Sequence, residues 1–267
     1  MAAAADRHRR AARLICEQRL ARTPIDPLPG DCRPRDETEG YVVQEVLHGL
    51  LASAGQGPIV GHKIGCTTPV MQAYLGIKNP CAGGIPATTV HHGHARVRHQ
   101  DYVRVGVECE IAVQVGADLG PAGAPFNRAR VAGAVAAVLA AMEIVDDRYR
   151  DYRTLDVATL IADDFFNAGC VLGTPVTGWR EVDLPAVTGV TRLNGVEAGR
   201  GEGRAVMGHP FEALAWLANL RARSGLGLHT GEFVLLGSVV ETRWVSAGDE
   251  VTVAIEGLGE VRATFAR

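Results

Sequence analysis

The chain has 267 residues, of which 47% are hydrophobic and 21% charged, and its formal net charge is −3. This composition suits one large domain, or one domain plus a small one. It argues against nucleic acid and acidic membranes as partners, and no apolar run approaches the roughly 20 residues of a membrane helix. The six cysteines are scattered without a CxxC pair, which favours reduced thiols in a cytoplasmic protein over disulfides or a zinc site.

The N-terminal part of the chain carries the helical signals. Residues 6–22 and 39–54 predict two helices, the second with an apolar face at helical spacing. Residues 59–64 then predict a short strand that carries Lys63.

The remainder of the chain is richer in strand signals. Residues 103–115 are dense in Val and Ile and predict a strand. Residues 128–142 are rich in Ala and Val, and we expect a buried helix there. This order predicts an α+β fold without sustained βαβ alternation. Other expected elements are strands within 87–97, 169–176, 187–197, 233–236 and 251–255, a loop at 199–203 and a helix at 210–224.

Two acids stand in the apolar strand at 103–115. Alternation places Glu108 and Glu110 on one face and Cys109 on the other. A solvated strand face is one interpretation. The other is a hard divalent cation that offsets the mutual repulsion of buried carboxylates. Glu143 ends the expected helix and is a third candidate ligand. Four aspartates are further candidate metal ligands: Asp146, Asp147, Asp163 and Asp164.

Lysine is rare in this chain. Of the 27 basic residues only Lys63 and Lys78 are lysines. Burial brings a lysine amine toward neutrality, whereas arginine stays charged. Lys63 is therefore a candidate acid or base.

Several other patterns carry less weight. His91, His92 and His94 lack a matching His or Cys pair for zinc, so we interpret them as structural residues or as residues that support the ligands of a site. The glycines at 199–203 lack the strand and helix context of a phosphate loop. Ser238 lacks a GxSxG nucleophile elbow and is interpreted as a hydrogen-bond donor at a strand end.

Taken together, six segments occur in the order seen in one known family. They are HKIG at 62–65, VECEIA at 107–112, MEIVDDR at 142–148, IADDFFNAG at 161–169, AVMGHPFEALAWLAN at 205–219 and GEFVLLGS at 231–238. The chain resembles the 2-keto-4-pentenoate hydratase and 4-oxalocrotonate decarboxylase group of the fumarylacetoacetate hydrolase superfamily. The resemblance spans nearly the whole chain.

This resemblance implies a mixed β-roll of the fumarylacetoacetate hydrolase C-terminal type. A helical N-terminal portion (residues 1–80) would precede a β-rich metal-binding domain (residues 81–267), in one continuous unit. By motif position, Glu108, Glu110 and Glu143 would hold Mg²⁺ or Mn²⁺, and Lys63 would be the catalytic lysine. Ser238 falls on the family's Gly-Ser motif, which lies beside the substrate. Because members of the family form homo-oligomers, we also expect a homo-oligomer here.

Two departures from the family pattern concern the substrate side of the expected site. Cys81 stands where hydratases of the family carry a water-activating Asp. The family's Asp-Asn before a Ser pair is here Asp163-Asp164, and Phe165 with the next Phe replaces the serines. Cys81, Asp164 and Phe165 are therefore expected to contact the substrate, in a less polar pocket than usual.

The implied function is that of a metal-dependent lyase acting on a small 2-oxo or 2-hydroxy acid. We expect a hydratase of a 2-hydroxy-2,4-dienoate that gives a 4-hydroxy-2-oxo acid. Decarboxylation of a 2-oxo-3-enedioate needs no water-activating acid and is the main alternative. A tautomerase or C–C hydrolase of the same superfamily, and a non-catalytic partner subunit, are further alternatives.

Overall fold

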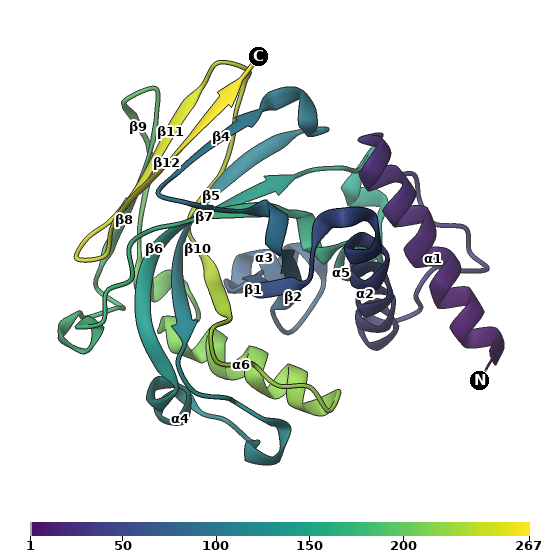
Figure 1. The fold of residues 1–267 in the computed structure, drawn as a ribbon, viewed down its shortest axis with the longest axis horizontal. Coiled ribbons are helices and arrows are strands. Elements are labelled where there is room, and N and C mark those ends of the chain that lie inside the picture. Colours follow the sequence, from purple (N-terminus) through teal and green to yellow (C-terminus); the bar gives the residue numbers. More distant parts are fainter. Residues whose placement is uncertain (1) are drawn as a thin grey trace.

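Two β-sheets and a group of N-terminal helices make up the fold in the computed structural model, which describes residues 2–267 (Figure 1). The α+β class and the helical N-terminal portion expected from the sequence are confirmed. Within the described residues, the structure has no helix that is long and apolar enough to cross a membrane.

The larger sheet has seven strands in the order β2-β1-β10-β5-β6-β7-β3. It is mixed, because β1 runs parallel to β10 and β3 runs parallel to β7, whereas its other neighbours are antiparallel. Since β1 lies inside this sheet, the strand that carries Lys63 is built into the β-rich part of the molecule. The strands are β1 (Ile59–Gly65), β2 (Cys81–Pro86), β3 (Val90–His92), β5 (Val105–Val115), β6 (Val135–Asp146), β7 (Asn167–Leu172) and β10 (Phe233–Trp244).

The smaller sheet has five strands in the order β4-β12-β11-β8-β9. Asn194 and Gly195 both have positive φ and form the turn between β8 and β9, as the Asn-Gly pair predicts. The strands are β4 (His94–Arg98), β8 (Thr188–Leu193), β9 (Val196–Glu202), β11 (Glu250–Ile255) and β12 (Gly259–Ala266).

The helices form two groups. α1 and α2 pack against each other, and α2 packs against α5; Gly40 of α2 allows this approach, since a Cβ there would lie 2.7 Å from the carbonyl oxygen of Ala158. At the other end of the molecule α6 packs against β10 and α4 (Figure 1). The helices are α1 (Ala2–Ala21), α2 (Glu37–Leu51), α3 (Pro69–Leu75), α4 (Arg128–Gly133), α5 (Val157–Ala162) and α6 (Pro210–Arg223).

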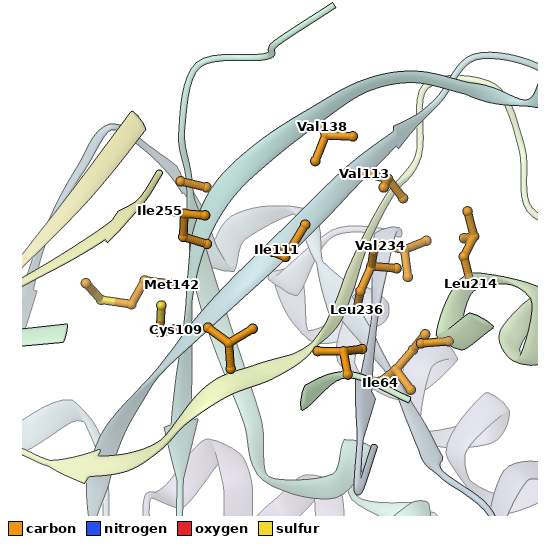
Figure 2. Packing of buried hydrophobic residues seen from close by; sticks show 14 of the residues in the cluster. Ile64, Cys109, Ile111, Val113, Val138, Met142, Leu214, Val234, Leu236 and Ile255 are labelled. Atoms are coloured by element: carbon orange, nitrogen blue, oxygen red, sulfur yellow. The ribbon is translucent and has the colours of Figure 1, made fainter. Parts of the chain in front are cut away.

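The two faces of β5 have different surroundings. Cys109, Ile111 and Val113 point into the main apolar core, which includes residues of the smaller sheet, such as Ile255, and of α6, such as Leu214 (Figure 2). The opposite face carries Glu108 and Glu110, followed by Ala112 in a second apolar cluster with side chains of β2, β6, β7 and β10. The acids therefore continue an apolar face of the sheet.

Two expected elements differ from the structure. Of the expected helix at 128–142, only residues 128–133 are helical, and residues 135–142 lie in strand β6. A strand buried on both faces is a continuous apolar run, which periodicity alone does not distinguish from a buried helix. The expected loop at 199–203 lies largely in β9; its glycines are required because a Cβ on Gly201 would lie 1.7 Å from the carbonyl oxygen of Val239.

Candidate metal centre and active site

Three carboxylates meet on the face of the seven-stranded sheet that carries Glu108 and Glu110. Glu108 pairs directly with Glu143 of β6 in the antiparallel register, and paired residues share a face. One carboxylate oxygen from each of Glu108, Glu110 and Glu143 lies within 4.8 Å of the others. Glu110 and Glu143 are fully buried and Glu108 is half-buried. The structure thus brings together the three residues expected to bind metal.

Each carboxylate of this triad is oriented by one hydrogen-bond donor. The backbone N–H of Gly237 donates to Glu110 Oε2 over 2.6 Å. Asn167 Nδ2 donates to Glu143 Oε1 over 2.9 Å, and the hydroxyl of Thr242 donates to Glu108 Oε1. Fixed donors of this kind hold ligand oxygens in place before a cation arrives.

The triad is electrostatically suited to a divalent cation. Burial and the neighbouring carboxylates Glu143 and Glu108 raise the pKa of Glu110 well above its ordinary value. Burial also raises the pKa of Glu143 to about 7, although Lys63 opposes the shift. Within the described residues, Glu110 Oε1 and Glu143 Oε2 are buried without a hydrogen-bond partner. Hard cations such as Mg²⁺ prefer such oxygen ligands, so the residues present fit a divalent metal.

Lys63 lies beside this triad. Its Nζ is 3.2 Å from Glu143 Oε1, and its side chain is 3% exposed. Burial alone would lower the pKa of Lys63, but Glu143, Glu108 and Glu110 outweigh it and raise the pKa. The three carboxylates therefore favour the protonated amine, which differs from the near-neutral lysine that burial alone suggests. In this form Lys63 holds a proton next to the site.

Ser238 and Cys81 lie on the strands that flank the triad and Lys63. Ser238 pairs with Glu110 in the sheet, and its hydroxyl donates to the backbone oxygen of Val240 over 2.5 Å. Cys81 pairs with Gly65, two residues beyond Lys63 on β1, and is fully buried. A hydrogen bond with Cys66 and burial raise the pKa of the Cys81 thiol. The thiol is therefore neutral and is not a base for water.

Asp164 and Phe165 differ in their relation to the site. The Asp164 carboxylate is fully buried, and its oxygens accept from His48 Nε2 at 2.6 Å, from Arg19 at 2.8 Å and from the N–H of Gly84 at 2.9 Å. The Asp164 carboxylate is thus held by residues of α1, α2 and β2, and its expected contact with substrate stays a prediction. Phe165, in contrast, places its ring centroid 5.4 Å from Lys63 Nζ.

Sequence reasoning missed the donors that orient the triad. Asn167 lies in the motif IADDFFNAG at 161–169, from which only the aspartates and phenylalanines were considered, so a sequence signal for this residue was present. Gly237 reaches Glu110 because the pairing of β10 with β5 is irregular between Leu235 and Ser238. Thr242 lies four residues beyond the recognised motif. Contacts of these two residues depend on the sheet register, which the sequence pattern does not reveal.

The chain is similar to known enzymes of one family over most of its length. The family model described as fumarylacetoacetate (FAA) hydrolase C-terminal matches residues 77–266. A 2-keto-4-pentenoate hydratase from Paraburkholderia phymatum is 37% identical, over 96% of this chain and 95% of its own. A 4-oxalocrotonate decarboxylase from Pseudomonas putida is 31% identical, over 85% of this chain and 84% of its own.

The fold is also similar to that of solved structures. The 4-oxalocrotonate decarboxylase from Pseudomonas putida G7, complexed with magnesium and adipate, has a TM-score of 0.90 to this chain. The two are 28% identical, and the match covers 97% of each chain. A second structure of that decarboxylase, complexed with calcium and acetate, gives a TM-score of 0.89.

Proposed function

Because the chain belongs to the fumarylacetoacetate hydrolase family, we propose that it is a hydro-lyase. In this proposal it converts a 2-hydroxy-2,4-dienoate to a 4-hydroxy-2-oxo acid with Mg²⁺ as cofactor. The proposal is supported by relatives named 2-keto-4-pentenoate hydratase. The observation that carries it is Lys63 Nζ at 3.2 Å from Glu143, within a carboxylate triad suited to a cation.

Glu108, Glu110 and Glu143 are the residues that would hold the metal. A bound divalent cation supplies Lewis-acid stabilisation of the negative charge that develops on the 2-oxygen of the substrate. The donors on Gly237, Asn167 and Thr242 keep the carboxylates in place without rearrangement.

Lys63 performs the proton transfer in this mechanism. Its ammonium delivers a proton to the distal carbon of the dienol while the 2-hydroxyl loses its proton, and a 2-oxo-3-enoate results. Conjugation with the new carbonyl makes C4 electrophilic. Water adds there: its hydroxyl bonds to C4 and its other proton goes to C3, which gives the 4-hydroxy-2-oxo acid. The proton that left the 2-hydroxyl restores the ammonium of Lys63. A positioned acid of this kind typically contributes about 10²–10⁴ in rate.

Decarboxylation of a 2-oxo-3-enedioate is the second candidate, and the neutral thiol at Cys81 favours it. In this family's hydratases an Asp at that place activates water, and decarboxylation through the same enolate needs no such group. The similarity to the 4-oxalocrotonate decarboxylases also supports this candidate.

One assay separates the candidates. Metal-stripped protein receives Mg²⁺ and 2-hydroxypenta-2,4-dienoate, or 4-oxalocrotonate in a parallel sample, and both diene absorbance and CO₂ are followed. A hydratase bleaches the dienoate without CO₂, a decarboxylase releases CO₂ from the diacid, and a non-catalytic subunit does neither. Loss of diene absorbance that is unaffected by a chelator would contradict the proposed function.

A further inference from the structure

Three consecutive residues next to the site have an unusual backbone. Asp164, Phe165 and Phe166 have φ angles of 56°, 48° and 69°. Positive φ is disfavoured for residues with a side chain. Such a run persists only where the surroundings hold it in place.

The segment is fixed from both ends. At one end the Asp164 carboxylate is bound by His48, Arg19 and the N–H of Gly84. At the other end the ring of Phe166 makes edge-on contacts with Tyr149 and Phe165, each with centroids 5.5 Å apart. Phe165, between these anchors, is 5% exposed.

These contacts direct the ring of Phe165 toward Lys63. A Cβ on Gly65 would lie 3.2 Å from Phe165 Cδ1 and 3.3 Å from Lys63 Nζ, so the ring and the amine approach the same point on β1. A substrate carbon that accepts a proton from Lys63 must come within about 3 Å of Nζ. Because the ring centroid is 5.4 Å from the same atom, the distal part of the substrate would lie against the ring.

The charges around Lys63 disfavour a second carboxylate there. Within residues 2–267, the fully buried cations are Lys63 and Arg148, and they already face Glu143 and Asp163. Arg19 is bound to Asp164. A distal carboxylate against the Phe165 ring would lose its hydration without gaining a free counter-charge, which is costly.

We propose that Phe165 determines substrate specificity by selecting 2-oxo acids whose distal end is uncharged. The ring forms an apolar wall beside Lys63, and the anchored segment 164–166 holds it there. This inference rests on the proposed function, in which Lys63 faces the distal carbon. It predicts that the enzyme prefers monocarboxylic dienoates to enedioates, because the second carboxylate of an enedioate would lie against the ring.

Two stable probes of equal chain length test the inference by binding, without turnover. Isothermal titration calorimetry on the Mg²⁺-loaded protein compares 2-oxohexanoate with 2-oxoadipate, which carries a carboxylate in place of the terminal methyl group. We expect 2-oxohexanoate to bind at least about 10-fold more tightly. Phe165→Ser, which restores the family's residue, should reduce this ratio below about threefold, and Phe165→Leu should preserve it. The Mg²⁺-induced rise in melting temperature checks that each variant is folded.

Equal binding of the two probes by the wild type would overturn the inference, even if the Ser variant did not fold. An unchanged ratio in folded Phe165→Ser would overturn it as well. Failure of the proposed function gives a different pattern. In that case the binding preference is present, but the dienoate is not consumed.

Discussion

Lys63 Nζ lies 3.2 Å from Glu143 Oε1, and the two buried side chains project from different strands of one sheet. This ion pair joins the proton carrier of the proposed reaction to the carboxylate triad. Its partners are buried, so removal of either charge leaves the other uncompensated.

Exchange of Lys63 for arginine should keep the charge but remove the transferable proton, because the arginine guanidinium does not titrate in the working range. We expect kcat for dienoate hydration to fall by about 100-fold or more. Lys78→Arg is the matched control, since Lys78 is exposed. A Lys63→Arg enzyme with full kcat would reduce Lys63 to a structural role.

Magnesium should stabilise the folded protein, because it relieves the repulsion among three close carboxylates. At a concentration of 100 times Kd the gain is about 2.7 kcal/mol, measurable by calorimetric melting. Without metal, Glu110→Gln should be at least as stable as the wild type. Glu110 is buried beside two other carboxylates and its Oε1 has no hydrogen-bond partner, so a neutral amide removes an unfavourable charge. A melting temperature of the wild type that does not respond to Mg²⁺ would contradict this expectation.

Asp164→Asn should destabilise the fold at pH 7 by about 3 kcal/mol, because the buried carboxylate pairs with the partly buried side chains of His48 and Arg19. Burial alone would raise the pKa of Asp164, but His48, Arg19 and the N–H of Gly84 hold it well below its ordinary value of 3.8. The stabilisation by the carboxylate is therefore present above pH 3.8 and lost as the pH falls.

Urea unfolding across this pH range measures the difference between Asp164→Asn and the wild type. The difference should be full at pH 7. It should shrink below about pH 4, because an ordinary Asp side chain, as in the unfolded state, takes up a proton there. Asp26→Asn is the control, since Asp26 forms an exposed pair with Arg150. A difference that is the same at pH 7 and pH 3, or absent at pH 7, would rule out this role of the carboxylate.

Gly83→Ala tests the contact between the strand opposite Lys63 and the segment at 164–166. A Cβ on Gly83 would lie 2.5 Å from the carbonyl oxygen of Asp164, which is backbone and cannot move away cheaply. We expect a loss of about 1–3 kcal/mol in the free energy of unfolding. Gly30→Ala, with no atom within 4 Å of its added Cβ, should be close to neutral.

The sequence predicted the parts of the site that depend on local pattern. Strand alternation placed Glu108 and Glu110 on one face, and the scarcity of lysine singled out Lys63. Glu143 was also a candidate, but it was expected at the end of a helix. The structure delivers it from strand β6, directly opposite Glu108, since an unbroken Ala and Val run fits a buried helix and a buried strand equally well.

Other parts of the site follow from tertiary contacts that no local pattern shows. Thr242 and Gly237 reach the triad through the irregular register of β10. Asp164 was expected to contact substrate, yet its partners His48 and Arg19 come from helices far away in the sequence. Such pairings are set by how the helices dock on the sheet, and the sequence motif around Asp164 does not reveal them.

The central claim is that the carboxylate triad binds the divalent cation on which activity depends. Calorimetric titration of Mg²⁺ into metal-stripped wild type, Glu110→Gln and Glu241→Gln tests it most directly, because Glu241 lies exposed on β10 outside the triad. We expect one saturable site per chain in the wild type and in Glu241→Gln, and none in Glu110→Gln. Equal Mg²⁺ affinity in wild type and Glu110→Gln would contradict the account.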